Sequence, residues 1–246
     1  MTEAVLLNNI SHKDLRIITK RGAEYGDDVI IVSTFPAEFR HIQSHYPIVF
    51  RKTNDGLSFD VFALFGFVAG ENLFLGPNGW DANYVPLAIQ RKPFLIGVDG
   101  ENLTVHVDMH SPRISSNADE GEAVFLKHGS PTEFMDRMNS TLLAIHQGVQ
   151  SMPAFIAALS AHDLFESFVA DIELSDGAKY RLDGFYTIKE EKLNALNGDA
   201  LEALHRAGYL QAIYMAIASM GNFRKLIERK NRLHAERDAR RAGGRH

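Results

Sequence analysis

The sequence contains no cysteine among its 246 residues. Disulfide bonds, thiolate metal ligands and a cysteine nucleophile are therefore excluded. Tryptophan occurs once, and no apolar run approaches the roughly 20 residues that a membrane-spanning helix requires. The first residues show no basic segment followed by an apolar core, which is the pattern of a secretory signal. We therefore expect a cytoplasmic protein without a transmembrane segment.

An excess of basic residues is absent as well. The chain has 26 Lys and Arg against 31 Asp and Glu, a formal net charge of −5 at pH 7. General nucleic-acid binders favour a basic surface because they contact phosphates, so nucleic acid is not an expected partner. Positive charge gathers only in residues 224–246, with nine Lys or Arg against three Asp or Glu. A regulator that contacts nucleic acid through this tail remains an alternative.

Motifs of the common enzyme classes are missing too. The segments Gly76–Gly79 and Gly97–Gly100 lack the glycine spacing and the lysine of nucleotide-binding loops, so we interpret them as turns. No Gly-x-Ser-x-Gly motif marks a nucleophilic serine. The sequence therefore predicts no cofactor and identifies no catalytic residue.

The first half of the chain is rich in strand-forming residues. Its β-branched and aromatic runs alternate with turn signals, a pattern typical of antiparallel strands. The run from Phe59 to Phe67 is apolar on both strand faces, so it needs cover on both sides. We expect a helix from residues 130–149 or 208–233 to pack on the face that carries Phe62 and Leu64.

These patterns predict an α+β fold in two halves. Residues 1–128 are expected to form a curved, barrel-like antiparallel sheet. Residues 129–236 are expected to be helical, with one β-hairpin at 168–183, and to pack with the first half as one unit.

Local signals predict where the helices begin and end. A capping box at Ser130 indicates one helix, and Pro153 indicates the start of a second. The apolar spacing of the last helix fades after Leu233. Residues 237–246 are therefore expected to form a basic, flexible tail.

The register of the hairpin follows from its charges. A three-residue loop, Ser175-Asp176-Gly177, places Glu173 opposite Lys179 and Asp171 opposite Arg181. A two-residue loop would instead set apolar residues against charged ones. We therefore predict the longer loop, with its glycine in the left-handed conformation.

His106 and Asp108 form the clearest metal-ligand pattern. Two residues apart on a strand, they would point the same way, and a His-x-Asp pair is half of the facial triad of iron oxygenases. His110 would lie ~13 Å from His106 along an extended strand, too far to share one metal. No signal marks His128 or His146 as a third ligand. A metal-dependent oxygenase-like enzyme that uses His106 and Asp108 is the alternative function, against a solvated polar strand face.

Three arginines flank stiff aromatic or proline-containing segments, where a guanidinium can hold a carboxylate of a peptide or small ligand. The competing interpretation is an internal ion pair, with a partner among Asp60, Glu71 and Asp108. A ligand groove is also expected near the aromatic residues of the central sheet. The ligand-binding candidates are Arg51, Trp80, Tyr84, Arg91 and Arg113.

A series of short motifs runs through the chain in order. They are Tyr46–Phe50, Gly70–Phe74, Tyr84–Pro86, Arg91–Phe94, Asp108 with Ser111–Arg113, Gly184–Ile188, Glu190–Leu193, Leu204–Gly208 and Ala218–Asn222. On these motifs the chain resembles the bacterial SapC family, named for a surface-layer-associated protein. The resemblance provides no catalytic residues. It implies an accessory protein of envelope and nutrient-uptake systems, sometimes encoded beside outer-membrane receptors and flavin-halogenase-like or cupin-like enzymes.

We therefore expect a non-catalytic binding or adaptor protein. It would recognise a peptide, a protein partner or a small ligand through the aromatic-rich central sheet. The main alternative, an enzyme, requires a concave pocket in which ionisable groups converge, whereas an adaptor requires an exposed apolar patch.

Overall fold

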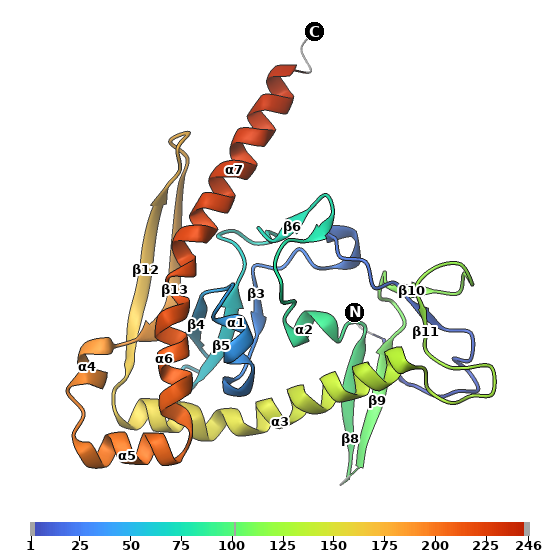
Figure 1. Ribbon diagram of the computed structural model, residues 1–246, viewed down its shortest axis with the longest axis horizontal. Helices are drawn as coiled ribbons and strands as arrows, with labels where there is room; N and C mark the ends of the chain where they lie inside the picture. The colour runs from blue at the N-terminus through green and yellow to red at the C-terminus, as the bar shows by residue number, and fades with distance from the viewer. Residues whose placement is uncertain (1–2, 101, 244–246) are drawn as a thin grey trace. The chain divides into compact units, whose positions relative to one another are not determined.

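The fold is α+β, as predicted, and the computed structural model in Figure 1 describes residues 3–100 and 102–243. The chain divides into two compact units. Unit 1 comprises Met1–Asp28, Leu75–Asp81 and Val85–Gln150, and unit 2 comprises Val29–Phe74, Ala82–Tyr84 and Ser151–His246. Each unit thus combines segments that are distant in the sequence.

Unit 1 is built from small antiparallel sheets. One sheet has the strand order β1 (Ala4–Leu6), β9 (Asn102–Asp108), β8 (Phe94–Asp99). A second has the order β10 (Ile114–Ser115), β2 (Arg16–Ile17), β11 (Glu122–Ala123). The third is the pair β6 (Leu75–Gly76) and β7 (Gly79–Trp80). The 3-10 turn η1 (Ala23–Tyr25) and the short helix α2 (Leu87–Gln90) connect them. Strands β8 and β9 flank the turn at Gly100, where the sequence predicts a turn.

The helix α3 (Glu133–Ala161) is continuous, which corrects the prediction of separate helices on either side of Pro153. Proline interrupts a helix because it lacks a backbone N–H donor. Here the turn after Pro153 carries the fully buried Phe155, and we attribute the continuity of the helix to this burial. The N-cap also differs from the expected Ser130, since Thr132 Oγ1 accepts a hydrogen bond from Met135 N at 3.3 Å.

Among the described residues, α3 alone has the length and apolar composition of a membrane-spanning helix. This is weak evidence for a span, because the core helix of a soluble protein passes the same test. The N-terminal part of α3 packs in the core of unit 1. That core consists of Leu15, Ile17, Phe94, Val107, Val124, Phe134, Met135, Met138 and Leu142.

Unit 2 contains a five-stranded antiparallel sheet that joins the central strands to the hairpin. Its order is β12 (Phe165–Glu173), β13 (Lys179–Ile188), β4 (Ile48–Lys52), β5 (Phe59–Leu64) and β3 (Ile31–Ser33). Strands β12 and β3 are the two edges of this sheet, so it is open and does not close into the barrel that the sequence suggested. The predicted hairpin is thus part of the same sheet as β3, β4 and β5.

The predicted register of the hairpin is confirmed. Glu173 lies opposite Lys179 and Asp171 lies opposite Arg181. The Lys179 Nζ–Glu173 Oε2 distance is 3.4 Å, and Arg181 Nη1 lies 3.0 Å from Asp171 Oδ1. Gly177 has a φ of 82°, the left-handed conformation that the three-residue loop requires.

The apolar strand β5 is covered on both faces, as predicted. Val61 and Ala63 on one face are buried, and Phe62 and Leu64 on the other face are buried too. The helix α6 (Tyr209–Ser219) contacts β4 and β13 of this sheet. It comes from one of the two segments that we expected to supply the cover, and its packing on the face of Phe62 and Leu64 stays a prediction.

The other helices of unit 2 are short except the last. They are η2 (Pro36–Glu38), α1 (Phe39–Ile42), α4 (Glu190–Asn194), α5 (Gly198–Arg206) and α7 (Asn222–Gly243). Because α7 runs to Gly243, residues 237–243 of the expected flexible tail are helical, and residues 244–246 lie outside the described part of the chain. Figure 1 shows α7 alongside the β12–β13 hairpin. Ser175 N donates a hydrogen bond to Asn231 Oδ1 at 2.8 Å there.

Candidate ligand-binding site

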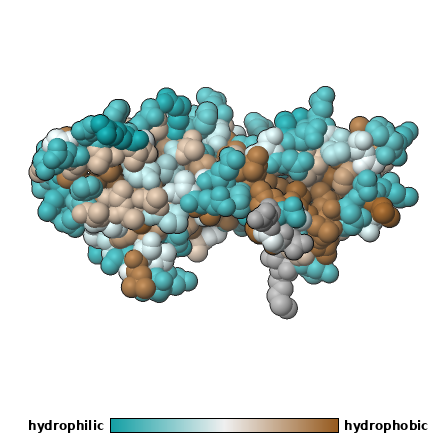
Figure 2. Space-filling model, turned by 90° about the horizontal axis from the view of Figure 1, so that it is seen from below, coloured by the Kyte–Doolittle hydropathy of each residue, from teal (hydrophilic) through white to brown (hydrophobic). Residues whose placement is uncertain are grey.

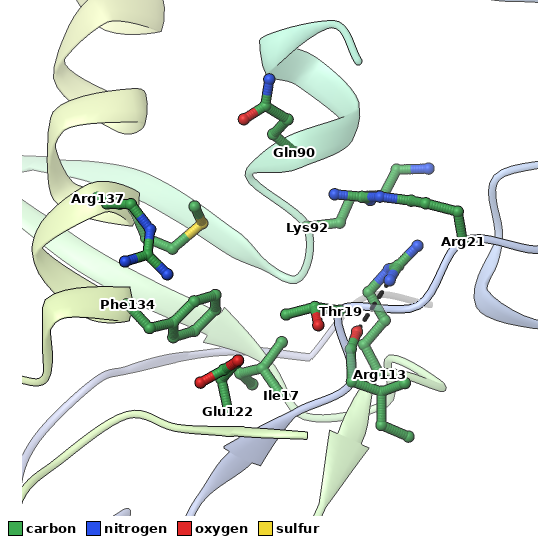
Figure 3. A pocket seen from close by; sticks show the side chains of 11 residues that line it. Ile17, Thr19, Arg21, Gln90, Lys92, Arg113, Glu122, Phe134 and Arg137 are labelled. Carbon is green, nitrogen blue, oxygen red and sulfur yellow. Dashed lines mark hydrogen bonds between the residues drawn. The ribbon is translucent and has the colours of Figure 1, made fainter. Parts of the chain in front are cut away.

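A cavity of about 200 Å³ opens in unit 1 between β2, α2 and α3. Figure 3 shows its polar side chains, which come from segments far apart in the sequence. The lining residues are Ile17, Ile18, Thr19, Arg21, Gln90, Lys92, Arg113, Glu122, Phe134, Arg137 and Met138. Four of them are cationic and one is a carboxylate.

Arg113 is fixed in place by hydrogen bonds from its guanidinium group. Its Nη2 donates to Asp27 Oδ2 at 2.7 Å, and its Nη1 donates to the carbonyls of Ile18 and Lys20 at 2.9 and 2.8 Å. Both members of the ion pair are buried, with side-chain exposures of 1% for Arg113 and 0% for Asp27. In the described part of the chain, Nε of Arg113 has no hydrogen-bond acceptor. One buried donor of this cavity-lining side chain therefore remains open.

Arg21 lies beside this ion pair. Its Nη1 donates to the Ile89 carbonyl at 3.2 Å and lies 3.8 Å from Asp27 Oδ1. Burial, together with the nearby charge of Arg113, lowers the pKa of Arg21 to about 10. Arg21 is therefore charged at neutral pH, and its charge is only partly compensated.

Lys92 and Arg137 complete the cationic part of the lining. Lys92 Nζ donates to the Gly26 carbonyl at 2.6 Å, and burial lowers the pKa of Lys92 below 10.5, although Asp27 opposes the shift. Arg137 is exposed, and its side chain has no hydrogen bond or ion pair with any described residue. The cations of the cavity thus exceed the carboxylates around them.

A second cavity, of about 530 Å³, lies in unit 1 and is also lined by Lys92. Arg91 lines it and donates from Nη1 to the Phe94 carbonyl at 2.7 Å. Burial lowers the pKa of Arg91. Asp108 also lines this cavity, and its Oδ1 accepts from the backbone N–H groups of Glu3 and His110 at 3.2 and 3.1 Å.

Comparison with protein families matches residues 7–226 of this chain to the family described as SapC. The chain belongs to the SapC family. The matched region contains every residue that lines the two cavities. Neither the curated proteins nor the solved structures contain a significant match to this SapC chain.

Two of the predicted binding residues line these cavities: Arg91 lines the larger and Arg113 the smaller. Arg113 forms an internal ion pair, but its partner is Asp27, which the sequence analysis did not consider. Trp80 also belongs to unit 1, where it is half-buried on β7.

Arg51 and Tyr84 belong to unit 2. Arg51 is exposed on β4, where its guanidinium carbon lies 4.7 Å from the centroid of the Phe62 ring. Tyr84 donates its hydroxyl hydrogen to Glu38 Oε1 at 2.9 Å, and its ring stacks on His41 at 4.9 Å. Burial and Glu38 raise the pKa of Tyr84.

The alternative metal pair lies on β9, as predicted. His106 Nε2 is 3.2 Å from Thr104 Oγ1, and Asp108 is engaged by backbone N–H groups. Within residues 3–100 and 102–243, no group of three His, Cys, Asp or Glu residues is placed to hold a metal ion. The described residues therefore offer no third ligand to complete a facial triad.

Sequence analysis missed Arg21, Lys92 and Arg137. A signal for Arg137 was present, because it follows Phe134 by three residues and precedes Met138 on the same helix face. A charged residue inside an apolar stripe marks a position where the stripe borders solvent or a cavity. Arg21 carried no comparable signal, since it lies in a loop whose partners come from distant segments.

The surface also carries exposed apolar side chains, which an adaptor would use. Val98 and Leu103 face each other across β8 and β9, with exposures of 65% and 44%. Figure 2 shows polar side chains over much of one face, with apolar side chains gathered in places between them. No feature of the described residues indicates what covers this apolar surface.

Proposed function

We propose that this SapC protein is a non-catalytic binding protein that holds an anionic small ligand, or an anionic group of a peptide or protein partner, in the 200 Å³ cavity of unit 1. The observation that carries the proposal is the charge around the cavity: four cations line it, Arg21, Lys92, Arg113 and Arg137, against the carboxylate of Glu122 in the lining and that of Asp27, which pairs with Arg113. Buried cations are costly unless anions pair with them. An anionic ligand would supply the missing negative charge.

The state of these cations supports the proposal. Arg113 is held rigidly by Asp27 and by two carbonyls, so its guanidinium is oriented before any ligand arrives. Arg21 uses one nitrogen for the Ile89 carbonyl, which leaves other N–H groups for a bidentate contact with a carboxylate or phosphate. Preorganised donors reduce the entropy lost on binding.

The composition of the lining favours binding over catalysis. The side chains that line this cavity in the described chain include no histidine, cysteine, serine or tyrosine, and Thr19, Lys92 and Glu122 are its only groups of the types that act as nucleophiles or general bases. An accessory role in envelope or nutrient-uptake systems, as the family resemblance implies, suits a protein that carries or senses a small anion.

Thermal unfolding tests the proposal. Acetate, citrate and phosphate are added at constant ionic strength, and a ligand that binds only the folded protein raises the melting temperature. We expect at least one of these anions to stabilise the protein and the Arg137→Gln variant to lose most of that response. If none of them raises the melting temperature, or if the variant responds like the wild type, the proposal is wrong.

A further inference from the structure

The volume of the cavity limits what it can hold. At about 200 Å³ it is somewhat larger than the cavities of ~150 Å³ that bind benzene. A ligand, or the bound part of a larger one, is thus limited to about one six-membered ring with a small substituent. Nucleotides and long peptides are too large to enter whole.

Most cations of the lining lie on one side of the cavity, and its large apolar side chains lie on the other. Figure 3 shows Arg21, Lys92 and Arg113 together on one side, and Phe134 from α3 across from them with Arg137 and Glu122 beside it. Met138 follows Phe134 by one helical turn and also lines the cavity. The two sides therefore favour different parts of a ligand.

This division distinguishes between classes of anion. Inorganic phosphate would pair with the cations but would leave the Phe134 side without an apolar partner. A neutral apolar ligand would remove water from Arg21 and Lys92 without compensating their charge, which is unfavourable. A ligand with both an anionic group and an apolar body satisfies both sides.

Glu122 disfavours a second negative charge on the apolar body of the ligand. Figure 3 shows its carboxylate beside Ile17 and Phe134, on the apolar side of the cavity. A second negative group on the ligand would meet this carboxylate, and like charges at short distance repel. One anionic group, directed at the arginines, is therefore preferred.

We infer that the cavity binds a compact monocarboxylate with a flat apolar body of about one ring, and this inference rests on the proposed function. Its carboxylate lies toward Arg21 and Lys92, and the charge of Arg137 attracts it from the side of Phe134. Its apolar body lies against Phe134 and Met138. The ligand class is thus small aromatic or cyclic carboxylic acids, either free or as a terminal group of a larger molecule.

Isothermal titration calorimetry with three probes tests this inference. Benzoate carries both features, inorganic phosphate has charge without an apolar body, and benzyl alcohol has the ring without charge. We expect benzoate to bind with a stoichiometry of one and at least about tenfold more tightly than either other probe, because each lacks one of the two interactions.

Two variants test whether benzoate binds in the cavity. Arg137→Gln removes an exposed guanidinium of the lining and is expected to weaken benzoate binding about tenfold, because one positive charge near the carboxylate is lost. Lys127→Gln is the matched control, because Lys127 is an exposed cation of unit 1 that does not line the cavity. Benzoate binding by this control is expected to equal that of the wild type.

The outcomes separate this inference from the proposed function. If phosphate binds more tightly than benzoate and Arg137→Gln weakens phosphate binding, the anion site stands but the monocarboxylate class is wrong. If benzyl alcohol binds as tightly as benzoate, the carboxylate is not recognised and the inference is overturned. If no probe binds, or if Arg137→Gln binds benzoate like the control, both the inference and the proposed function fail.

Discussion

Arg113 Nη2 donates a 2.7 Å hydrogen bond to Asp27 Oδ2 across a sequence separation of 86 residues, with both side chains buried. The bond joins the segment after β9 to the loop after η1. It also fixes a guanidinium beside the candidate binding cavity. The same pair thus stabilises unit 1 and orients the site.

Removing one partner of this pair should strongly destabilise the protein. Asp27→Asn leaves the Arg113 charge buried without its counterion, which typically costs about 3–5 kcal/mol of unfolding free energy. Urea unfolding measures the change. Asp28→Asn is the control, since Asp28 is exposed and should change the free energy of unfolding by less than about 0.5 kcal/mol. Equal effects of the two substitutions would contradict the structural role of the pair.

Ligand binding should be coupled to the protonation of Lys92. Burial lowers the pKa of Lys92 below 10.5, so its ammonium loses a proton at a lower pH than an exposed lysine. A bound anion favours the charged form and raises that pKa. Benzoate binding should therefore take up protons at pH values approaching 10.5 and take up almost none near pH 7.

Calorimetry in two buffers of different ionisation enthalpy measures this proton uptake. Lys92→Gln should reduce the uptake and leave the part that Arg21 contributes, since the pKa of Arg21 is about 10. Arg137→Gln should weaken binding and retain the full uptake. Proton uptake that is unchanged in Lys92→Gln would show that Lys92 is not responsible.

A second buried ion pair should hold α7 in place within unit 2. Lys230 forms a salt bridge with Glu71, and the side-chain exposures are 3% and 12%. Lys230 Nζ also lies 4.6 Å from the centroid of the Tyr180 ring. We expect Glu71→Gln to lower the free energy of unfolding by about 3 kcal/mol, because Lys230 then remains buried and uncompensated.

The exposed pair between Arg224 and Glu228, on the same helix, provides the comparison for Glu71→Gln. Glu228→Gln should cost only about 0.3–0.5 kcal/mol, as is usual for exposed pairs one helical turn apart. Urea unfolding of the two variants gives the difference. A cost for Glu71→Gln as small as that for Glu228→Gln would show that the buried pair does not hold the helix.

Truncation should locate the part of α7 that contributes to stability. His234 Nδ1 lies 2.7 Å from Asp176 Oδ2, and Asn231 accepts from Ser175 N. Residues 235–237 are exposed. A stop codon after Glu236 should therefore leave the melting temperature within about 1–2 °C, whereas a stop after Arg229 should lower it by several degrees. Calorimetric scans measure the melting temperature of both variants. A large decrease for the variant that ends at Glu236 would mean that the end of the helix packs against the protein.

The features that could be predicted from the sequence are those set by neighbouring residues. The hairpin register follows from charges within a few residues of Gly177, and the burial of Phe62 and Leu64 follows from the lack of polar residues around them. Both were correct because local patterns determine them. The family assignment likewise rests on short motifs that are read directly from the sequence.

The features that could not be predicted depend on distant segments or on compensation by packing. Neither Asp27 nor Arg113 is marked as the partner of the other, and the cavity combines loops, two strands and two helices. The continuity of α3 through Pro153 depends on tertiary burial, which overrides the local preference of proline. The sheet is open, with the hairpin at one edge and β3 at the other, an arrangement that strand patterns do not specify.

A crystal structure determined with saturating benzoate tests the central claim most directly. The account predicts one benzoate in the cavity of unit 1, with its carboxylate within about 3 Å of side-chain nitrogens of Arg21 or Lys92 and its ring on Phe134 and Met138. The account would be contradicted by a cavity that holds only water under these conditions, or by benzoate bound only away from these cations.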